Sequence, residues 1–392
     1  MHGGRQGRER GVVALLGALS AFGPLSVDLY LPALPAVQAE FSAGQSSVQL
    51  TLSAVVLGLA AGQLIAGPLS DRFGRRAPAL VGVSAWALAS LLSAFSPTVE
   101  ALIAIRLLQG LGGAAGVVLA RAVVRDRAEG SDAARTYAVL ASIAGVAPVV
   151  APILGGQLLR LTDWRGLFVV LAGVGTLLAL ATAWRLPETL PPGSRVGAGL
   201  RTTWSNARRL ARRRTFCAAV LAQGLGFAAL FTYITSSPFA LQVGYGLSAQ
   251  QFSVVFAINA VGLVLGGQAS RLLVPRIGAR RLLRTGLVLQ TLAGATLLVT
   301  VPAGAGLPVV LPALFVVVAA TGLVLPNGTA LAMADVPDMA GTASALIGAG
   351  QFAIAGIVAP LAGLGAPAAI LPMAMVITTS AVLGSVAATH TN

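Results

Sequence analysis

Apolar stretches of about twenty residues follow one another along the whole chain, and short polar segments separate them. Each stretch is long enough to cross a bilayer as an α-helix, which needs about 20 apolar residues. The runs are unbroken rather than alternating, so they favour helices over a transmembrane barrel. The pattern predicts twelve membrane-spanning helices, at residues 11–33, 47–69, 77–96, 99–121, 136–159, 165–185, 215–240, 249–273, 282–301, 306–333, 341–364 and 367–388.

A polar stretch rich in proline, glycine and arginine divides these helices into two sets of six. It reads "LPETLPPGSRVGAGLRTTWSNARRLARRR" and is either a solvated spacer or a linker that ends in an amphipathic surface helix. We therefore expect an N-terminal six-helix bundle at 1–185, a cytoplasmic linker at 186–214 and a C-terminal six-helix bundle at 215–392.

The two sets share a repeated sequence between their second and third helices. "GQLIAGPLSDRFGRR" spans residues 62–76, and "GQASRLLVPRIGARR" spans residues 267–281. Two six-helix units in parallel orientation, with a binding site at their interface, are typical of transporters. The predicted fold class is thus an all-α integral membrane protein built from two pseudo-symmetric bundles.

Composition and charge agree with this assignment. The chain is 56% hydrophobic and only 10% charged, whereas soluble proteins have about a quarter of their residues charged. All 26 basic residues are arginines, and they concentrate in every second loop rather than in one patch. The positive-inside rule then places both termini in the cytoplasm, and the net charge of +14 does not indicate a nucleic-acid partner.

Few residues are available for metal or enzyme chemistry. Cys217 is the single cysteine, and the two histidines, His2 and His390, stand at the ends of the chain. A disulfide within the chain, a zinc site and a histidine-based triad inside the fold are excluded, and no ATP-binding loop is present. We expect neither an enzyme nor a cofactor, with transport driven by the proton gradient.

Two charges lie inside predicted spans. Asp28 is about five residues from the outer end of the first helix, where Pro32 and Pro35 are expected to turn the chain out of the membrane. Arg106 is about seven residues into the fourth helix. A charge at mid-membrane costs about 2.5–3.5 kcal/mol, so such residues are usually functional. Asp28 can load and release a proton as the site opens to alternate sides. The alternatives are a fixed ion pair between the two, or an aspartate at the membrane surface capped by water.

The fourth and fifth helices carry one-sided stripes. In "RLLQGLGG", Gln109 follows Arg106 by three residues and can orient its guanidinium, while the glycines permit close helix contact. On the fifth helix, Gly145, Pro148, Pro152 and Gly156 form a stripe whose prolines create bending points.

The most specific stretch is "GPLSDRFGRR", between the second and third helices. Its glycines favour a tight loop, and Asp71 can pair with Arg75 or Arg76 across the cytoplasmic mouth. The candidate gating residues in this loop are Gly67, Asp71, Arg72, Gly74, Arg75 and Arg76.

These motifs resemble those of the major facilitator superfamily, whose loop signature is Gly-x-Leu-x-Asp-Arg-x-Gly-Arg-Arg. "R-x-x-Q-G-x-G" and the fifth-helix stripe resemble motifs of its drug exporters. "VDLYLPALP", "APVVAPILGGQLL" with "WRGLF", and "FAINAVGLVLGG" are similar more narrowly to its Bcr/CflA group of drug:proton antiporters. The resemblance covers essentially the whole chain. It implies proton coupling by Asp28 and Arg106, and a gating contact between Asp71 and the opposite half.

Two departures from the family pattern stand out. Ala147 precedes Pro148 where exporters commonly have glycine, and a second proline follows at Pro152. The second half has Pro275 near the position of Asp71, so the resemblance implies an asymmetric gate.

The expected substrate site is a central cavity lined by the first and fourth helices of each half. Its aromatic and neutral polar groups suit amphiphilic molecules with little or no charge, although each aromatic residue taken alone is more often a packing or lipid-facing residue. The candidates are Tyr30, Gln109, Gln223, Phe227, Phe231, Tyr233, Asn259 and Asn327.

The expected function is efflux of small amphiphilic drugs across the cytoplasmic membrane, coupled to protons. Within the resembling group, chloramphenicol, florfenicol and bicyclomycin are the natural substrate candidates. The expected partners are the drug, protons and the lipid bilayer, with no nucleic acid and with a monomer as the working unit. The alternatives are proton-coupled transport of a small metabolite such as a sugar or amino-acid derivative, a membrane-embedded enzyme, and a receptor or scaffold.

Overall fold

The computed structural model describes residues 2–127, 130–191, 200–334, 336, 339–364 and 370–391, and within these ranges the regular structure is helical throughout. The first half contains α1 (His2–Ser20), α2 (Phe22–Asp28), the short turn η1 (Leu31–Ala33), α3 (Leu34–Phe41), α4 (Gln45–Phe73), α5 (Arg76–Ala94), α6 (Val99–Arg127), α7 (Gly130–Leu158) and α8 (Trp164–Arg185). Then come α9 (Leu200–Ala211), α10 (Arg214–Pro238), η3 (Phe239–Gly244), α11 (Ala249–Ile277), α12 (Ala279–Thr300), α13 (Leu307–Met333), α14 (Ala340–Val358), η5 (Ala359–Gly363) and α15 (Ile370–Thr389).

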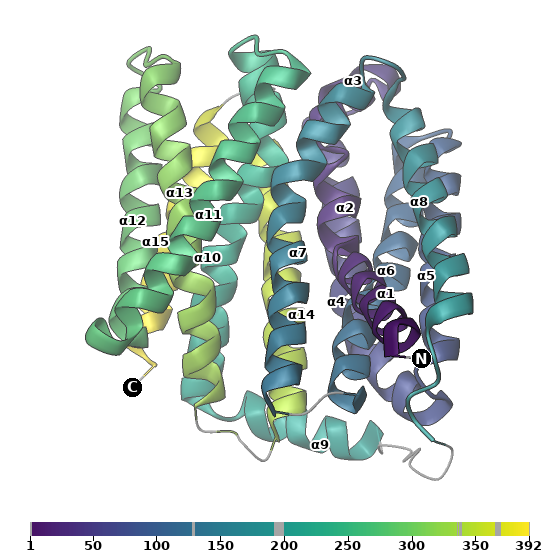
Figure 1. The fold of residues 1–392 in the computed structure, drawn as a ribbon. Coiled ribbons are helices and arrows are strands. Elements are labelled where there is room, and N and C mark those ends of the chain that lie inside the picture. The colour runs from purple at the N-terminus through teal and green to yellow at the C-terminus, as the bar shows by residue number, and fades with distance from the viewer. Residues whose placement is uncertain are drawn as a thin grey trace.

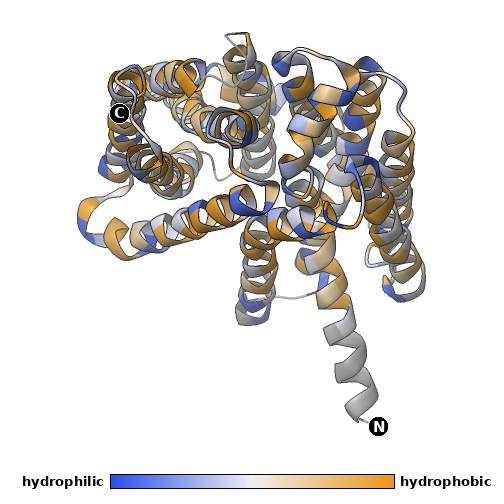
Figure 2. Cartoon of the chain, turned by 90° about the horizontal axis from the view of Figure 1, so that it is seen from above, coloured by the Kyte–Doolittle hydropathy of each residue, from blue (hydrophilic) through white to orange (hydrophobic). Residues whose placement is uncertain are grey.

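The expected number of spans is confirmed. Within the described ranges, eleven helices are long and apolar enough to cross a membrane, and residues 11–41 form a twelfth, bent path. Seen along the helices, most of the ribbon carries hydrophobic residues, shown in orange (Figure 2). The chain is therefore an all-α membrane protein with the twelve-helix arrangement that its sequence pattern predicts.

The first span differs from its prediction. Pro32 and Pro35 do not end the helical path; each instead begins a new short helix, η1 and α3, and the path continues to Phe41. Proline is tolerated in the first turn of a helix because the amide hydrogen it lacks has no helical partner there. The bend of 44° lies earlier, between Ser20 and Phe22. Asp28 is consequently thirteen residues before the end of the path rather than five.

The two halves lie side by side, with the second half on the left of Figure 1 and most of the first half on the right. Their most extensive contacts with each other are between α4 and α14 and between α7 and α11. The labelled chain ends and α9 all lie in the lower part of Figure 1. We call this side of the molecule, marked by α9, the linker side. Of the two alternatives for the linker, the structure agrees with an amphipathic helix, because residues 200–211 form one, α9.

The internal repeat has a structural counterpart. The helices α4 and α11 are both 29 residues long, and each ends at a glycine with positive φ, Gly74 at 89° and Gly278 at 83°. Residues with a side chain rarely adopt this left-handed region, so glycine is the residue that fits both turns. The second and third helices of each half are thus joined by the same kind of tight turn.

Candidate functional site

Asp28 is the last residue of α2, and its side chain is buried, with 5% exposed. Among the described residues it has neither an ion pair nor a side-chain hydrogen bond. A charged residue at this depth costs several kcal/mol unless it is compensated. Asp28 is therefore an acid held inside the bundle without a fixed partner.

Arg106 on α6 is completely buried and belongs to a hydrogen-bond network inside the first half. One terminal nitrogen donates to the Ser26 carbonyl at 2.6 Å, and the other donates to the side-chain oxygen of Gln109. Gln109 in turn donates to Ser90 Oγ on α5 at 2.7 Å. Trp86, also on α5, donates to Ser26 Oγ at 2.8 Å and so connects α5 to the same turn of α2. The network holds the backbone two residues before Asp28.

The guanidinium of Arg106 is also covered by two aromatic rings. Its central carbon lies 5.1 Å from the ring centre of Tyr30 and 5.3 Å from that of Phe168 on α8. A cation is stabilised over an aromatic face, more strongly where water is excluded. Arg106 is thus contacted by α2, α8 and the segment that carries Tyr30, and it forms no ion pair with Asp28 in this structure. Its Nε is buried and has no hydrogen-bond partner among the described residues. Gln109 orients Arg106, as its spacing suggests, and lies fully buried beside it.

The helices α4 and α6 pack closely against each other at Gly110. A Cβ atom on Gly110 would lie 2.1 Å from the Val55 carbonyl oxygen of α4, so only glycine fits there. The predicted close contact at the glycines of the fourth helix is therefore present.

Tyr233 on α10 is a residue of the second half that lies near Asp28. The Tyr233 hydroxyl accepts a hydrogen bond of 2.8 Å from Asn259 Nδ2 on α11, and its ring stacks on Phe256 at 5.7 Å. Tyr233 lies within electrostatic reach of the Asp28 carboxyl. The structure thus brings together Asp28, Tyr233 and Asn259, three of the residues singled out from the sequence.

Hydrogen bonds join the halves on the side opposite the linker side, and five of them lie between described residues. Buried Gln49 on α4 contributes two of them, and its side-chain oxygen, Oε1, has no partner among the described residues. Neighbouring Ser53 Oγ is likewise buried without a partner there. The five bonds are Ser46 Oγ to Pro360 O (3.2 Å), Gln49 Nε2 to Ser236 Oγ (2.9 Å) and to Thr235 O (3.4 Å), Gln242 Nε2 to Pro32 O (3.2 Å), and Gln250 Nε2 to Gly156 O (2.8 Å).

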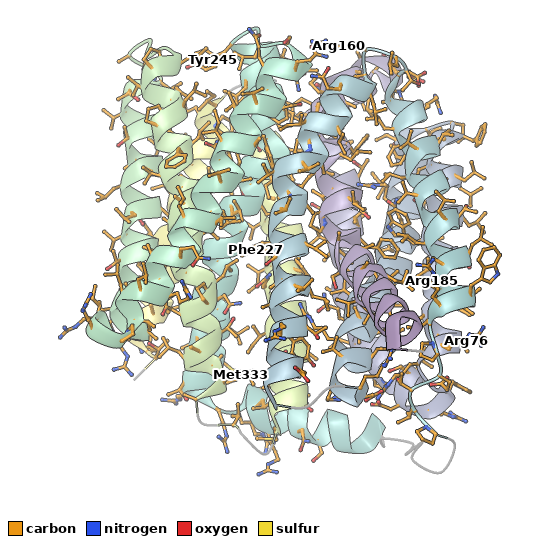
Figure 3. The ribbon with its side chains drawn as sticks, viewed as in Figure 1. Arg76, Arg160, Arg185, Phe227, Tyr245 and Met333 are labelled. Carbon is orange, nitrogen blue, oxygen red and sulfur yellow. The ribbon has the colours of Figure 1, made fainter. Side chains whose placement is uncertain are left out.

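Closer to mid-height, α10 carries an aromatic and amide cluster. Phe227, labelled in Figure 3, stacks on Phe231 at 6.2 Å and meets Phe352 of α14 edge-on at 5.5 Å. Gln223 donates to Gln351 Oε1 at 2.9 Å and accepts from Thr329 at 3.0 Å. This cluster contains two aromatic rings and one amide expected in the cavity, and it carries no charge.

Asn327 is placed differently from these cavity candidates. Its amide donates to Ser270 Oγ on α11 at 2.6 Å and to the Leu323 carbonyl at 2.7 Å, inside the second half. The structure therefore gives Asn327 a contact between α13 and α11.

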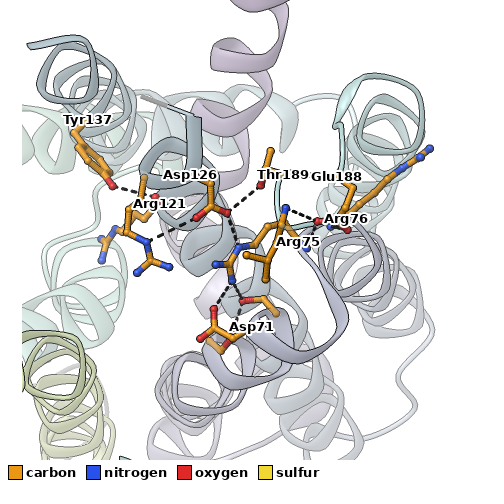
Figure 4. Close-up of polar contacts among 12 residues, drawn as sticks. Asp71, Arg75, Arg76, Arg121, Asp126, Tyr137, Glu188 and Thr189 are labelled. Atoms are coloured by element: carbon orange, nitrogen blue, oxygen red, sulfur yellow. Dashed lines mark hydrogen bonds and ion pairs between the residues drawn. The ribbon is translucent and has the colours of Figure 1, made fainter. Parts of the chain in front are cut away.

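On the linker side, Arg75 forms the centre of a charge cluster (Figure 4). It is 2% exposed, and it pairs with Asp71 at 2.6 Å and with Asp126 of α6 at 2.8 Å. Burial alone would lower the pKa of Arg75, but hydrogen bonds to Asp126 and Asp71 outweigh burial and raise it. The expected Asp71–Arg75 pair is present, within one half of the molecule.

Glu188 completes this cluster from the start of the linker. Its two carboxylate oxygens accept from the backbone amides of Arg75 and Arg76, at 2.7 and 3.3 Å, where α5 begins. The Arg76 side chain donates to the Ala183 carbonyl near the end of α8. A carboxylate at a helix N-terminus satisfies free amides and complements the helix dipole. The linker is thus anchored to the loop between the second and third helices.

Sequence reasoning missed Asp126 and Glu188. Asp126 stands between Arg125 and Arg127, where a pair with a neighbour is the simpler interpretation, and Glu188 lies in a stretch of prolines. Their acidic character in an arginine-rich surface was the one available signal. The remaining loop candidates are less engaged: a Cβ on Gly67 would meet open space, and exposed Arg72 lies over Phe73 at 5.2 Å.

The stripe on α7 divides into two parts. A Cβ on Gly145 would meet open space, whereas a Cβ on Gly156 would lie 2.5 Å from Ser253 Oγ on α11. Gly155, which was not predicted, packs still more closely, because a Cβ there would lie 2.1 Å from the carbonyl oxygen of Leu29 in the first half. Pro148 and Pro152 both lie inside the continuous helix α7.

Comparisons with known proteins agree with this architecture. Residues 15–360 match the family model of the Major Facilitator Superfamily. The chain is 38% identical over 388 residues to the uncharacterized MFS-type transporter YdgK of Bacillus subtilis, covering 97% of this chain and 95% of that protein. It is 31% identical to a bicyclomycin resistance protein homolog of Haemophilus influenzae, covering 89% and 88%. It is 34% identical to a chloramphenicol resistance protein of Pseudomonas aeruginosa, covering 73% and 67%.

A solved structure has the same fold. The crystal structure of a bacterial homolog of the human lysosomal transporter Spinster superposes with a TM-score of 0.75 at 16% identity, covering 97% of this chain and 95% of the other. The match of fold and the family model, which spans most of the chain, point to one conclusion. This chain belongs to the major facilitator superfamily and is a multi-pass membrane transporter.

Proposed function

We propose that this transporter exports small amphiphilic drugs across the cytoplasmic membrane in exchange for protons. The observation that carries the proposal is Asp28, a buried acid without a fixed partner among the described residues, which lies within electrostatic reach of Tyr233 in the opposite half. An acid at the interface of two moving halves can be exposed to alternate sides of the membrane. It can then take up a proton on one side and release it on the other.

Arg106 acts in this scheme as a positioning residue. Its bond to the Ser26 carbonyl fixes the turn of α2 that carries Asp28, and its guanidinium contacts Gln109, Tyr30 and Phe168. Because no ion pair holds the Asp28 carboxyl, that group is free to bind a proton or to contact a substrate. We therefore assign proton coupling to Asp28 and the support of its helix to Arg106.

A neutral, amphiphilic substrate class is supported by the side chains around α10. Phe227, Phe231 and Phe352 offer apolar faces, and Gln223 and Gln351 offer amide groups that select for hydrogen-bonding atoms. Relatives named for resistance to bicyclomycin and chloramphenicol support the same class. We propose phenicols and bicyclomycin as the first compounds to test.

The transport cycle is proposed to follow alternating access. Bonds such as Gln49–Ser236 and Gln250–Gly156 hold the halves together on the side opposite the linker side. If the arginine-rich linker side faces the cytoplasm, this structure is closed toward the outside. Export then requires these bonds to break, so that a drug taken up from the cytoplasmic side leaves on the other. We propose that a monomer completes this cycle without a cofactor.

Drug resistance in living cells tests the function. The gene is expressed in a bacterial host that lacks its own efflux pumps, and growth is measured across an antibiotic panel with and without a protonophore. We expect resistance to at least one neutral amphiphilic antibiotic, lost when the proton gradient collapses. Resistance that survives the protonophore would contradict proton coupling. If the panel gives no resistance while labelled sugars or amino-acid derivatives accumulate in a proton-dependent manner, the metabolite alternative is correct.

The variant Asp28→Asn tests the assigned residue in the same assay. It should abolish resistance while the protein remains folded and present in the membrane at the parent level. Glu100→Gln, which neutralises an exposed acid at the start of α6, is the matched control and should retain resistance. Normal resistance in the Asp28→Asn variant would remove Asp28 from the mechanism.

A further inference from the structure

A groove of about 700 Å³ lies between α9, α10 and α14, away from the polar centre described above. Its walls are almost entirely apolar, and the side chains that define it are Arg208, Phe216, Cys217, Leu221, Leu346 and Ile354. Leu221 is 46% exposed, so one wall faces outward from the bundle. The groove starts at α9 and extends along α14 as far as Ile354, fourteen residues beyond the first residue of that helix, or about 20 Å.

Close packing closes the far end of the groove. A Cβ on Gly224 of α10 would lie 2.5 Å from Ile354 Cδ1. On the linker side, Leu210 of α9 is buried, and Cys217 Sγ is 3.2 Å from the Ala211 carbonyl that it contacts as a donor. These contacts fix α9 across the mouth of the groove, so the groove is open to the side and bounded at both ends.

The mouth of the groove is strongly basic. Five arginines, all exposed, stand within seven residues at the end of α9 and the start of α10: Arg208, Arg209, Arg212, Arg213 and Arg214. Arg208 itself lines the groove. The described part of the chain gives neither Arg208 nor Arg212 an ion pair. An apolar groove with unpaired cations at one end is complementary to an anionic lipid, which has an apolar chain and a negative headgroup.

We propose that this groove binds an anionic phospholipid of the membrane leaflet on the linker side. One acyl chain lies between α10 and α14, and the phosphate contacts Arg208 and Arg212. Guanidinium groups bind phosphate oxygens well, and basic segments at a membrane surface attract anionic lipids. The lipid would stabilise the contact between the linker helix and the second half, because α9 forms one end of the groove.

Lipid binding to the purified full-length protein tests this site by native mass spectrometry. Equal amounts of phosphatidylglycerol and phosphatidylcholine are added, and the ratio of the two bound species is measured. We expect a clear preference for phosphatidylglycerol, which drops by roughly tenfold or more in the double variant Arg208→Gln, Arg212→Gln. The double variant Arg276→Gln, Arg281→Gln removes the same charge from exposed arginines of α11 and α12 on the same side, and it should keep the preference. Equal binding of both lipids by the parent, or an equal loss in both double variants, would overturn the proposal.

Cys217 gives a second readout, because it is the single cysteine of the chain and lies exposed on the groove wall. In nanodiscs, its reaction with N-ethylmaleimide should slow severalfold when phosphatidylglycerol replaces phosphatidylcholine, and the Arg208→Gln, Arg212→Gln variant should lose this protection. Leu221→Trp, which fills the groove without changing charge, should lower phosphatidylglycerol binding. Undiminished binding in that variant would place the lipid elsewhere.

Discussion

At the scale of single residues, the two intramembrane charges have different environments. Arg106 is surrounded by acceptors and aromatic rings, whereas Asp28 has no fixed partner within the described ranges. Both could be singled out from the sequence because each interrupts an apolar run. The sequence could not show that the two charges are not paired, because the Arg106 contact with Ser26 depends on how α2 packs against α6. An arginine can satisfy its charge with a backbone carbonyl and a glutamine, and no residue pattern shows which acceptor is nearest.

A second residue-scale result is the central position of Arg75 in the linker-side cluster. Replacing Arg75 by glutamine leaves Asp126 and Asp71 without their shared cation. We expect a loss of about 1–3 kcal/mol in the free energy of unfolding, because removing one partner of a largely buried ion pair is destabilising, while Asp71 keeps solvent and Asp126 keeps the Thr189 hydroxyl. The measurement is the melting temperature of the purified protein in detergent.

Arg72→Gln is the control for this prediction, because Arg72 is exposed and, among the described residues, contacts the ring of Phe73 without an ion pair. It should change the melting temperature little. An Arg75→Gln protein as stable as the parent would show that the cluster contributes nothing to stability.

At the scale of elements, the first span shows why helix ends are hard to predict. The sequence predicts that Pro32 and Pro35 turn the chain out of the membrane. In the structure they start η1 and α3, so Asp28 is about 20 Å of helical rise from the end of the path. A proline excludes hydrogen bonding only at its own nitrogen, and it is compatible with both a helix end and a helix start.

The helix pair α4 and α10 carries the contact that we expect to control opening. Gln49→Ala removes the two hydrogen bonds to Ser236 and Thr235. Each such bond contributes about 0.5–1.5 kcal/mol, so losing both should lower the ratio of closed to open molecules on this side by about fivefold or more. Spin labels attached at positions 42 and 243, in a Cys217→Ser background, report the distance between the two halves by electron paramagnetic resonance. In the Gln49→Ala variant, the fraction of molecules with long distances should rise.

Gln268→Ala is the matched change for this experiment, since Gln268 is exposed on α11. It should leave the distance distribution unchanged. If Gln49→Ala gives the parent distribution, the hydrogen bonds across α4 and α10 do not hold the halves closed.

At the scale of the whole molecule, the sequence predicts the architecture well. Apolar runs define the spans, and the repeat between residues 62–76 and 267–281 corresponds to two helices of equal length that each end at a left-handed glycine. The interface between the halves could not be predicted, because single polar residues such as Gln49 and Gln250 form it. Their sequence neighbourhood does not distinguish them from lipid-facing or internal polar residues.

The distribution of arginine makes a prediction about orientation. Both termini and the linker helix α9 should face the cytoplasm, because basic loops stay on that side. Reporter fusions test it: alkaline phosphatase fused after Thr391 should be inactive, and a fluorescent protein there should fluoresce. The opposite pair of results would reverse the transport direction that we propose.

The central claim is that drug movement and proton movement occur together through Asp28. The direct measurement uses purified protein in proteoliposomes with a pH-sensitive dye in the lumen, an imposed pH gradient and a labelled drug found in the resistance panel. The parent protein and the Glu100→Gln control should move drug and protons together, and Asp28→Asn should move neither under the gradient. Drug uptake by the parent without a change in lumen pH, or proton-driven uptake by Asp28→Asn at the parent rate, would contradict this account.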